Sequence, residues 1–182
     1  MENDQEAEIK GIFFQGLLRD IERKKGTEEK EKILKLLPRD KYYGFQFYSW
    51  REYRTLQEET MKTLFGKIDN DTWEELAKMV IEYFRRITIG KTLLALCSGD
   101  IMRGIDMAAR TMGTFTKGVQ FTTSANTLES LQIRVTNIVE EPIYWKKIWE
   151  ELADAIGYKV KITYEKLGER DYLYKGIAEP LN

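Results

Sequence analysis

The chain has 182 residues, of which 42% are hydrophobic and 32% are charged, and this composition is typical of a soluble globular domain. Its formal net charge is −1, so no overall positive field exists to hold nucleic acid or an acidic membrane surface. The chain has no histidine, which excludes Ser-His-Asp triads and Cys-His dyads and removes the usual zinc and proximal haem ligands. We therefore expect no nucleic-acid partner, no metal and no cofactor.

We expect a cytoplasmic protein. Cys97 is the one cysteine, so no disulfide can form within the chain. Met1 is followed by Glu, Asn and Asp, the opposite of the basic start of a signal peptide. No apolar run approaches the roughly 18 residues of a membrane span. Many lysines and glutamates without histidine are also a feature of proteins from thermophiles.

An apolar stripe near the start of the chain, EIKGIFFQGLLRDI at residues 8–21, has helical spacing and predicts a helix that Gly26 ends. Two glycines within the stripe each weaken a helix by about 1 kcal/mol. An extended segment over 9–15, with the helix starting near Gly16, is therefore an alternative, and we prefer the helix. The acidic residues 1–8 before it are expected to fray.

Cap residues predict the next two helices. Thr27 is the predicted cap of one helix, which Pro38 stops because proline cannot continue a helix. Ser49 and Glu52 have the spacing of a capping box and predict the start of another helix. Gly66 is its predicted C-terminal cap.

A longer helical pattern follows. Asn70 or Asp71 is its predicted cap, and apolar residues at helical spacing continue as far as Ile87. From Ile87 to Cys97 the one charge is Lys91, so this end is predicted to be buried on most sides. After a turn, one more helix is predicted.

The pattern then changes from a helical period to alternation. Alternating residues over 119–125 and 131–139 predict a hairpin with a short link at Asn126. Pro142 is typical of the first turn of a helix, and a second hairpin that turns around Gly168 follows that helix.

The predicted order is several helices followed by β-β-α-β-β, so we expect an α+β fold with an antiparallel sheet. The helix between the two hairpins is expected to cover one face of this sheet, and the N-terminal helices the other apolar surface. We expect a single domain over residues 1–182, since the chain has no low-complexity linker and no repeat.

Several short motifs resemble chemical sites but have simpler interpretations. The tripeptide GKT at 90–92 lacks the earlier glycine and the preceding strand of a phosphate loop. Asp106 and Arg110 have the spacing of a helix-surface ion pair. The segment YWKKIW, residues 144–149, fits one buried helix face better than a nucleic-acid platform. Cys97 lies among apolar residues and is interpreted as a buried structural thiol.

Four segments occur in a characteristic order: GIFFQGLLRDI, SWREYRTLQEETMKTLFG, ELAKMVIEYFRRITIGKTLLAL and FTKGVQFTTSANTLESLQIRVTNI. Together with a VEEP segment and the final helix and hairpin, they resemble an uncharacterised bacterial family first catalogued mainly in myxobacteria. The resemblance covers nearly the whole chain. It implies no assigned activity.

More distantly, the chain resembles the ligand-binding superfamily of nitric-oxide sensing and Golgi transport, which includes haem nitric-oxide domains and 4-vinyl-reductase domains. This resemblance implies N-terminal helices packed with an antiparallel sheet around an apolar cavity, and members often dimerise. The chain lacks the haem-ligating histidine and the cysteine cluster that aromatic sensors use for zinc. What the resemblance implies is therefore the fold and a pocket, without haem sensing through histidine and without zinc.

We hypothesise a non-enzymatic ligand-binding or sensing module, in which an apolar cavity holds a hydrophobic small molecule, a lipid or an acyl chain. The candidate wall residues are Phe13, Phe14, Leu17, Phe84, Leu94, Cys97, Met102 and Phe115. Phe14→Trp is then expected to block ligand uptake.

Two other classes of function remain open. One is a dimeric interaction or adaptor module with a filled core and no ligand. The other is an enzyme that uses carboxylates, tyrosine or lysine, which requires a cleft where such groups converge. We expect a homodimer, and we assign no catalytic residue.

Overall fold

The computed structural model describes residues 7–124 and 127–181, and in them seven helices and seven strands follow one another along the chain. The helices are α1 (Gly11–Lys25), α2 (Thr27–Leu34), α3 (Trp50–Phe65), α4 (Asn70–Arg86), α5 (Thr88–Cys97), α6 (Ile101–Phe115) and α7 (Pro142–Ala155). The strands are β1 (Glu8–Lys10), β2 (Phe47–Ser49), β3 (Thr116–Lys117), β4 (Gln120–Thr123), β5 (Leu131–Thr136), β6 (Tyr158–Lys166) and β7 (Tyr172–Pro180).

The last four strands form one antiparallel sheet in the order β4-β5-β7-β6. Leu131, Ile133 and Val135 of β5 are buried, whereas alternate residues of β6 and β7 are exposed. One face of the sheet is therefore covered and the other faces solvent. The predicted α+β class and the β-β-α-β-β order are confirmed, while the predicted link at Asn126 lies outside the described residues.

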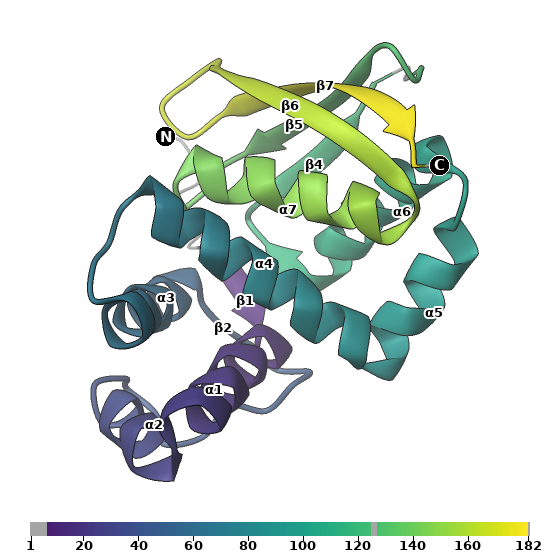
Figure 1. Ribbon diagram of the computed structural model, residues 1–182. Coiled ribbons are helices and arrows are strands. Elements are labelled where there is room, and N and C mark those ends of the chain that lie inside the picture. Colours follow the sequence, from purple (N-terminus) through teal and green to yellow (C-terminus); the bar gives the residue numbers. More distant parts are fainter. Residues whose placement is uncertain (1–6, 125–126, 182) are drawn as a thin grey trace.

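The helices cover the sheet in layers. Figure 1 shows α7 lying along one face of the four-stranded sheet, α4 beside α7, and α1, α2 and α3 farther from the sheet. Trp145 and Trp149 are both buried on the face that α7 turns inward, four residues apart as one face of a helix requires. Lys146 and Lys147, between them, pair with glutamates of the same helix. The interpretation of YWKKIW as one buried helix face is confirmed.

A second, smaller sheet was not predicted from the sequence. Its order is β2-β1-β3, so the first strand of the chain lies in the middle. Ala7 is buried, Glu8 pairs with Ser49 and Lys117 in the two neighbouring strands, and the Lys117 ammonium lies 2.7 Å from the Glu8 carboxylate. The expectation that residues 1–8 fray is therefore wrong for the last two of them, and residues 1–6 lie outside the described part.

The start of α1 combines both sequence alternatives. Ile9 lies in the short strand β1, and the helix begins two residues later, at Gly11. Only glycine fits at this junction, because a Cβ at position 11 would lie 2.3 Å from the carbonyl oxygen of Tyr43. The preferred helix is confirmed over most of its length, and Gly26 ends it as predicted.

Two of the predicted caps are wrong by one residue. The N-cap of α4 is Asp69, whose carboxylate accepts from Thr72 N in a capping box, and not Asn70 or Asp71. Thr27 is the first residue of α2 rather than its cap. At α4 adjacent polar residues offer the same capping chemistry, and the position where the backbone turns decides between them. At α2 the N-cap position is occupied by Gly26, which makes no side-chain capping hydrogen bond. Ser49 and Gly66, by contrast, cap α3 as predicted.

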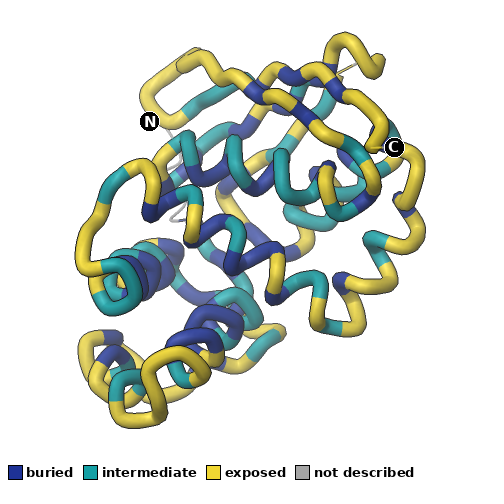
Figure 2. The backbone as a smooth tube through the Cα atoms, in the orientation of Figure 1, coloured by how far each residue is buried: buried dark blue, intermediate teal, exposed yellow. Residues whose placement is uncertain are grey.

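The segment from Ile87 to Cys97 differs most from its prediction. It is a separate helix, α5, in which Ile89 is 44% and Leu96 is 49% exposed, so it is not buried on most sides. Figure 2 shows α5 mainly in the exposed and intermediate classes. The helical backbone is interrupted at Ile87, which is extended. The following helix, α5, packs against α4 and α6 with only one of its faces. The GKT tripeptide lies inside this helix and forms no phosphate loop.

Candidate functional site: an apolar cavity between the helices and the sheet

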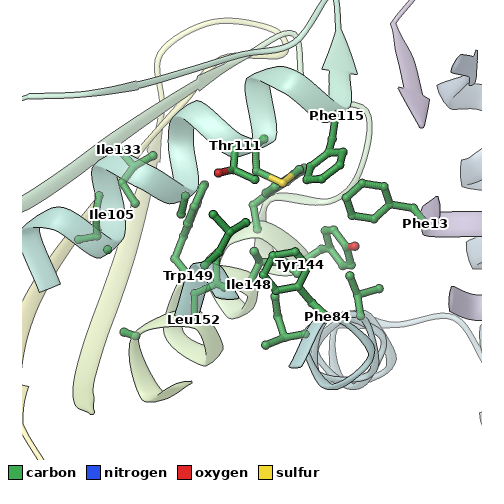
Figure 3. Close-up of a pocket in the computed structure, with 18 of the residues that line it drawn as sticks. Phe13, Phe84, Ile105, Thr111, Phe115, Ile133, Tyr144, Ile148, Trp149 and Leu152 are labelled. Carbon is green, nitrogen blue, oxygen red and sulfur yellow. The ribbon is translucent and has the colours of Figure 1, made fainter. Parts of the chain in front are cut away.

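A cavity of about 110 Å³ lies between the helices and the covered face of the four-stranded sheet. Side chains from α1, α3, α4, α5, α6 and α7 line it, together with inward-facing residues of β5, β6 and β7. Figure 3 shows Phe13 and Phe115 facing one another on one side of the cavity and Ile105 and Leu152 on the other. Among the lining residues of the described chain, Glu140 is the only one with a formally charged side chain.

The structure brings six of the eight candidate wall residues to this cavity. They are Phe13, Leu17, Phe84, Leu94, Cys97 and Phe115. Met102 is half-buried against the core but does not line the cavity, and neither does Phe14. The geometry places these side chains, and whether they bind a ligand stays a prediction.

Two adjacent residues of α1 point in different directions. The Phe13 ring reaches into the cavity and meets the Phe115 ring edge to face at 5.8 Å. Phe14 is completely buried and stacks on Tyr42, with ring centroids 4.1 Å apart. A tryptophan at Phe14 would overpack this cluster rather than fill the cavity, so Phe14→Trp is not a specific test of ligand uptake.

The wall contributed by α7 was missed in the sequence analysis. The aromatic rings of Tyr144, Trp145 and Trp149 line the cavity from this helix, with Ile148 and Leu152 beside them. The i, i+4 spacing did predict a buried face. It could not show that this face borders a space rather than a filled core, because both environments select the same apolar residues.

A buried carboxylate joins two parts of this wall. Glu140 is 5% exposed and accepts hydrogen bonds from the indole N–H groups of Trp50 at 2.5 Å and Trp145 at 3.1 Å. Burial raises the pKa of the Glu140 carboxyl, and the two indole donors lower it in part. The carboxylate thus ties α3 to α7.

Three polar atoms in and beside the wall have no hydrogen-bond partner. They are the hydroxyl of Tyr53, the side-chain carbonyl of Gln57 and the indole N–H of Trp149. Tyr53 and Trp149 both line the cavity. A buried polar group without a partner costs free energy, and such groups therefore point to a missing partner in the space that they face.

The single thiol is a structural one. Cys97 is buried, its sulfur lies 3.4 Å from the sulfur of Met107, and burial raises the pKa of the thiol. A raised pKa keeps sulfur protonated and therefore weakly nucleophilic. The geometry agrees with the interpretation drawn from the sequence.

Two further features are absent from the described ranges 7–124 and 127–181. No helix there is both long and apolar enough to cross a bilayer. Within the same ranges, histidine, cysteine and acidic residues form no group of three or more that could hold a metal ion.

The fold matches those of solved H-NOX proteins. A crystal structure of an H-NOX protein from S. oneidensis in the Fe(II)NO ligation state aligns with a TM-score of 0.71 over 94% of this chain and 99% of that one, at 12% identity. The Fe(II) unliganded H-NOX protein from K. algicida aligns with a TM-score of 0.64 over 94% and 97% of the two chains, at 16% identity. At such identities the likeness establishes an H-NOX-like fold and nothing further.

The sequence itself places the chain in a family. It belongs to the family described as protein of unknown function (DUF2378), which matches residues 4–175. The predicted membership in an uncharacterised family and the predicted distant relation to the haem nitric-oxide fold are both confirmed. No curated protein matches the sequence.

Haem, which an H-NOX-like fold implies, does not fit this site. The chain has no histidine to ligate iron, and no lysine or arginine is among the described residues that line the cavity to pair with propionates. The cavity of about 110 Å³ is also below the roughly 300 Å³ at which pockets for drug-sized ligands begin, and a porphyrin needs at least that.

Proposed function

We propose that this protein is a ligand-binding or sensing module that holds a small, mainly apolar organic molecule in the cavity. The observation that carries the proposal is the cavity itself, which has aromatic and aliphatic walls and lies between the helices and the sheet. Protein interiors are close-packed and contain few voids larger than a water molecule, so an apolar cavity of this size favours a bound ligand. The H-NOX-like fold supports the proposal by analogy alone.

The size of the cavity limits the ligand. An engineered apolar cavity of about 150 Å³ binds benzene or xenon. The cavity here is about 110 Å³, which favours a molecule no larger than about one six-membered ring. This volume favours a small molecule over an acyl chain among the ligands considered from the sequence.

Filling the cavity from its wall tests the proposal. Thr111 of α6 lines the cavity, and Thr114 of the same helix is exposed and does not. We expect Thr111→Leu to weaken the binding of benzene by about tenfold, because the added bulk occupies the space that benzene needs. Benzene binding is measured by NMR titration and by the shift in the unfolding temperature that a ligand of the folded state produces.

Thr114→Leu is the matched control, with the same change on the same helix. It should bind benzene as the wild type does. If the wild type shows no benzene binding by either method, the proposal is wrong. If both variants lose binding equally, benzene does not occupy the cavity.

A second candidate, an interaction module, is favoured by exposed aromatic residues in the segment before β2. Tyr43 and Phe45 are both exposed, and Phe45 is 82% exposed. Exposed aromatic side chains are enriched where proteins contact one another. The native mass of the benzene-free sample gives the oligomeric state directly.

A further inference from the structure

One end of the cavity contains a hydrogen-bond donor that the protein leaves unused. Tyr53 is completely buried and lines the cavity, and its hydroxyl lies beside the Tyr144 hydroxyl and the Gln57 side chain without hydrogen-bond geometry to either. The Phe13 ring lies against it at 6.1 Å, on the side of the cavity that Phe13 and Phe115 close. A buried tyrosine hydroxyl normally finds a partner, so the space in front of Tyr53 is where that partner is missing.

Hydrogen-bond acceptors lie beside this donor. Gln57 follows Tyr53 by one turn of α3, and its side-chain carbonyl is buried without a partner. Its amide nitrogen is 3.5 Å from the Glu140 carboxylate, which therefore belongs to the same group of polar atoms. One donor and two acceptors thus lie together at one end of an otherwise apolar cavity, where Tyr53 and Glu140 line the wall and Gln57 lies directly beside them.

We propose that the ligand carries a hydroxyl group, which accepts a hydrogen bond from Tyr53 and donates one to Gln57 or Glu140. This inference rests on the proposed function and names the chemical class of the ligand. A hydroxyl is both a donor and an acceptor, so it can satisfy both kinds of atom at once. A pure hydrocarbon would leave the Tyr53 hydroxyl and the Gln57 carbonyl unpaired, and an ether or ketone would still leave the carbonyl unpaired.

Charged ligands fit this end less well. A carboxylate ligand would face Glu140, and no lysine or arginine among the described lining residues could balance its charge. An ammonium ligand would need an ionised Glu140, and burial disfavours that form by raising the pKa of the carboxyl. A neutral ring or short chain with one hydroxyl, such as a phenol, is the class that remains.

Phenol and benzene form the matched pair of probes, since they differ by the hydroxyl alone. The quantity to measure is the ratio of the phenol Kd to the benzene Kd, obtained by NMR titration of each protein. We expect Tyr53→Phe to raise this ratio about tenfold above that of the wild type. Gln57→Met, which removes the unpaired carbonyl, should raise the ratio in the same direction.

Tyr42→Phe is the control. Tyr42 is also a buried tyrosine, but its hydroxyl donates to Glu52 at 3.1 Å and it does not line the cavity. Its substitution should leave the ratio at the wild-type value. Tyr53→Phe should also unfold at the same temperature as the ligand-free wild type or higher, because it removes an unpaired buried hydroxyl.

The outcomes separate this inference from the proposed function. If benzene binds and Tyr53→Phe leaves the ratio unchanged, the ligand hydroxyl is not recognised at Tyr53 and the inference is overturned. The same conclusion follows if ligand-free Tyr53→Phe unfolds at a clearly lower temperature, because the hydroxyl then has a partner within the protein. If neither probe binds to the wild type, the proposed function fails and this inference fails with it.

Discussion

Phe13 and Phe14 are neighbours in the sequence, yet they belong to regions that are packed in opposite ways. Phe14 lies in a filled cluster with Tyr42 and Tyr48, whose ring centroids are 4.1 Å and 5.6 Å from its own. Phe13 borders the cavity. Within one turn of α1, the packing therefore changes from a fully packed aromatic cluster to the wall of a cavity.

The two regions also treat their polar groups differently. In the filled cluster the hydroxyl of Tyr42 donates to Glu52, and that of Tyr48 accepts from Tyr43 N at 2.7 Å. In the cavity wall Tyr53 and Trp149 keep donors without partners. Proteins pair nearly all buried polar groups, so the unpaired donors of the cavity wall are the feature that the proposed ligand would explain.

The largest expected effect compares the two phenylalanines directly. Phe14→Ala should lower the free energy of unfolding by about 4 kcal/mol, because it opens a cavity in a region that is fully packed. Phe13→Ala should cost about half as much, because Phe13 is half-buried and already borders empty space. Urea unfolding of both variants measures the difference, and equal losses would contradict the division.

Two glycines sharpen the comparison at a smaller scale. A Cβ at Gly11 would lie 2.3 Å from the backbone oxygen of Tyr43, and one at Gly104 would lie 2.3 Å from Cδ1 of Ile156. The end of the Ile156 side chain can move into the cavity that it lines, whereas the backbone of Tyr43 cannot move freely. We expect Gly11→Ala to cost about 3 kcal/mol and Gly104→Ala about 1 kcal/mol or less, again by urea unfolding.

These two substitutions control for each other, since both add one methyl group to a helix. A large loss of stability for Gly104→Ala would mean that the space beside Ile156 cannot take up a side chain. The cavity would then be too rigid to admit a ligand of any size beyond its present volume.

The smallest expected effect lies at Glu140, where the two regions meet. Its pKa in the folded protein is raised by burial, so between the ordinary value of 4.5 and the raised value the folded state binds more protons than the unfolded state. Stability from this group is therefore lost as the pH rises through that range. Glu140→Gln does not titrate, so the variant should gain stability relative to the wild type as the pH rises above the ordinary value of 4.5.

Urea unfolding at several pH values measures this relative gain, with Glu141→Gln as the control. Glu141 is half exposed and pairs with Arg54. The other ionisable side chains that act on Glu140 include Arg54, Tyr53, Tyr144 and Tyr174, and both variants retain them. A stability difference for Glu140→Gln that stays constant with pH would show that burial does not perturb this carboxyl.

Sequence reasoning succeeded where the signal is local. Ser49 and Gly66 mark the ends of α3, Pro142 opens α7, and the alternation of β5 shows which residues face inward. These features depend on the backbone within a few residues, which is the range that caps and periodicity describe. The short strands of the smaller sheet have no such signal, because two or three residues cannot show a period.

The cavity was predictable only in part. Six wall residues were identified because they are apolar and lie at helical spacing, and Phe14 was included for the same reason. Which of two adjacent phenylalanines faces a space depends on how α1 packs on α3 and α6, and this is a tertiary property. The unpaired hydroxyl of Tyr53 could not be predicted, because the sequence does not show whether a buried tyrosine hydroxyl has a hydrogen-bond partner.

The central position of β1 in the smaller sheet has a consequence for how the chain folds. Glu8 and Ile9 pair with Lys117 and Thr116, which follow them by more than one hundred positions in the sequence. Contacts so distant in sequence close late, because the loop between them must be ordered first. The helices near the start of the sequence can form as soon as they are made. Their final packing around the cavity requires that residues 116 and 117 have also been synthesised.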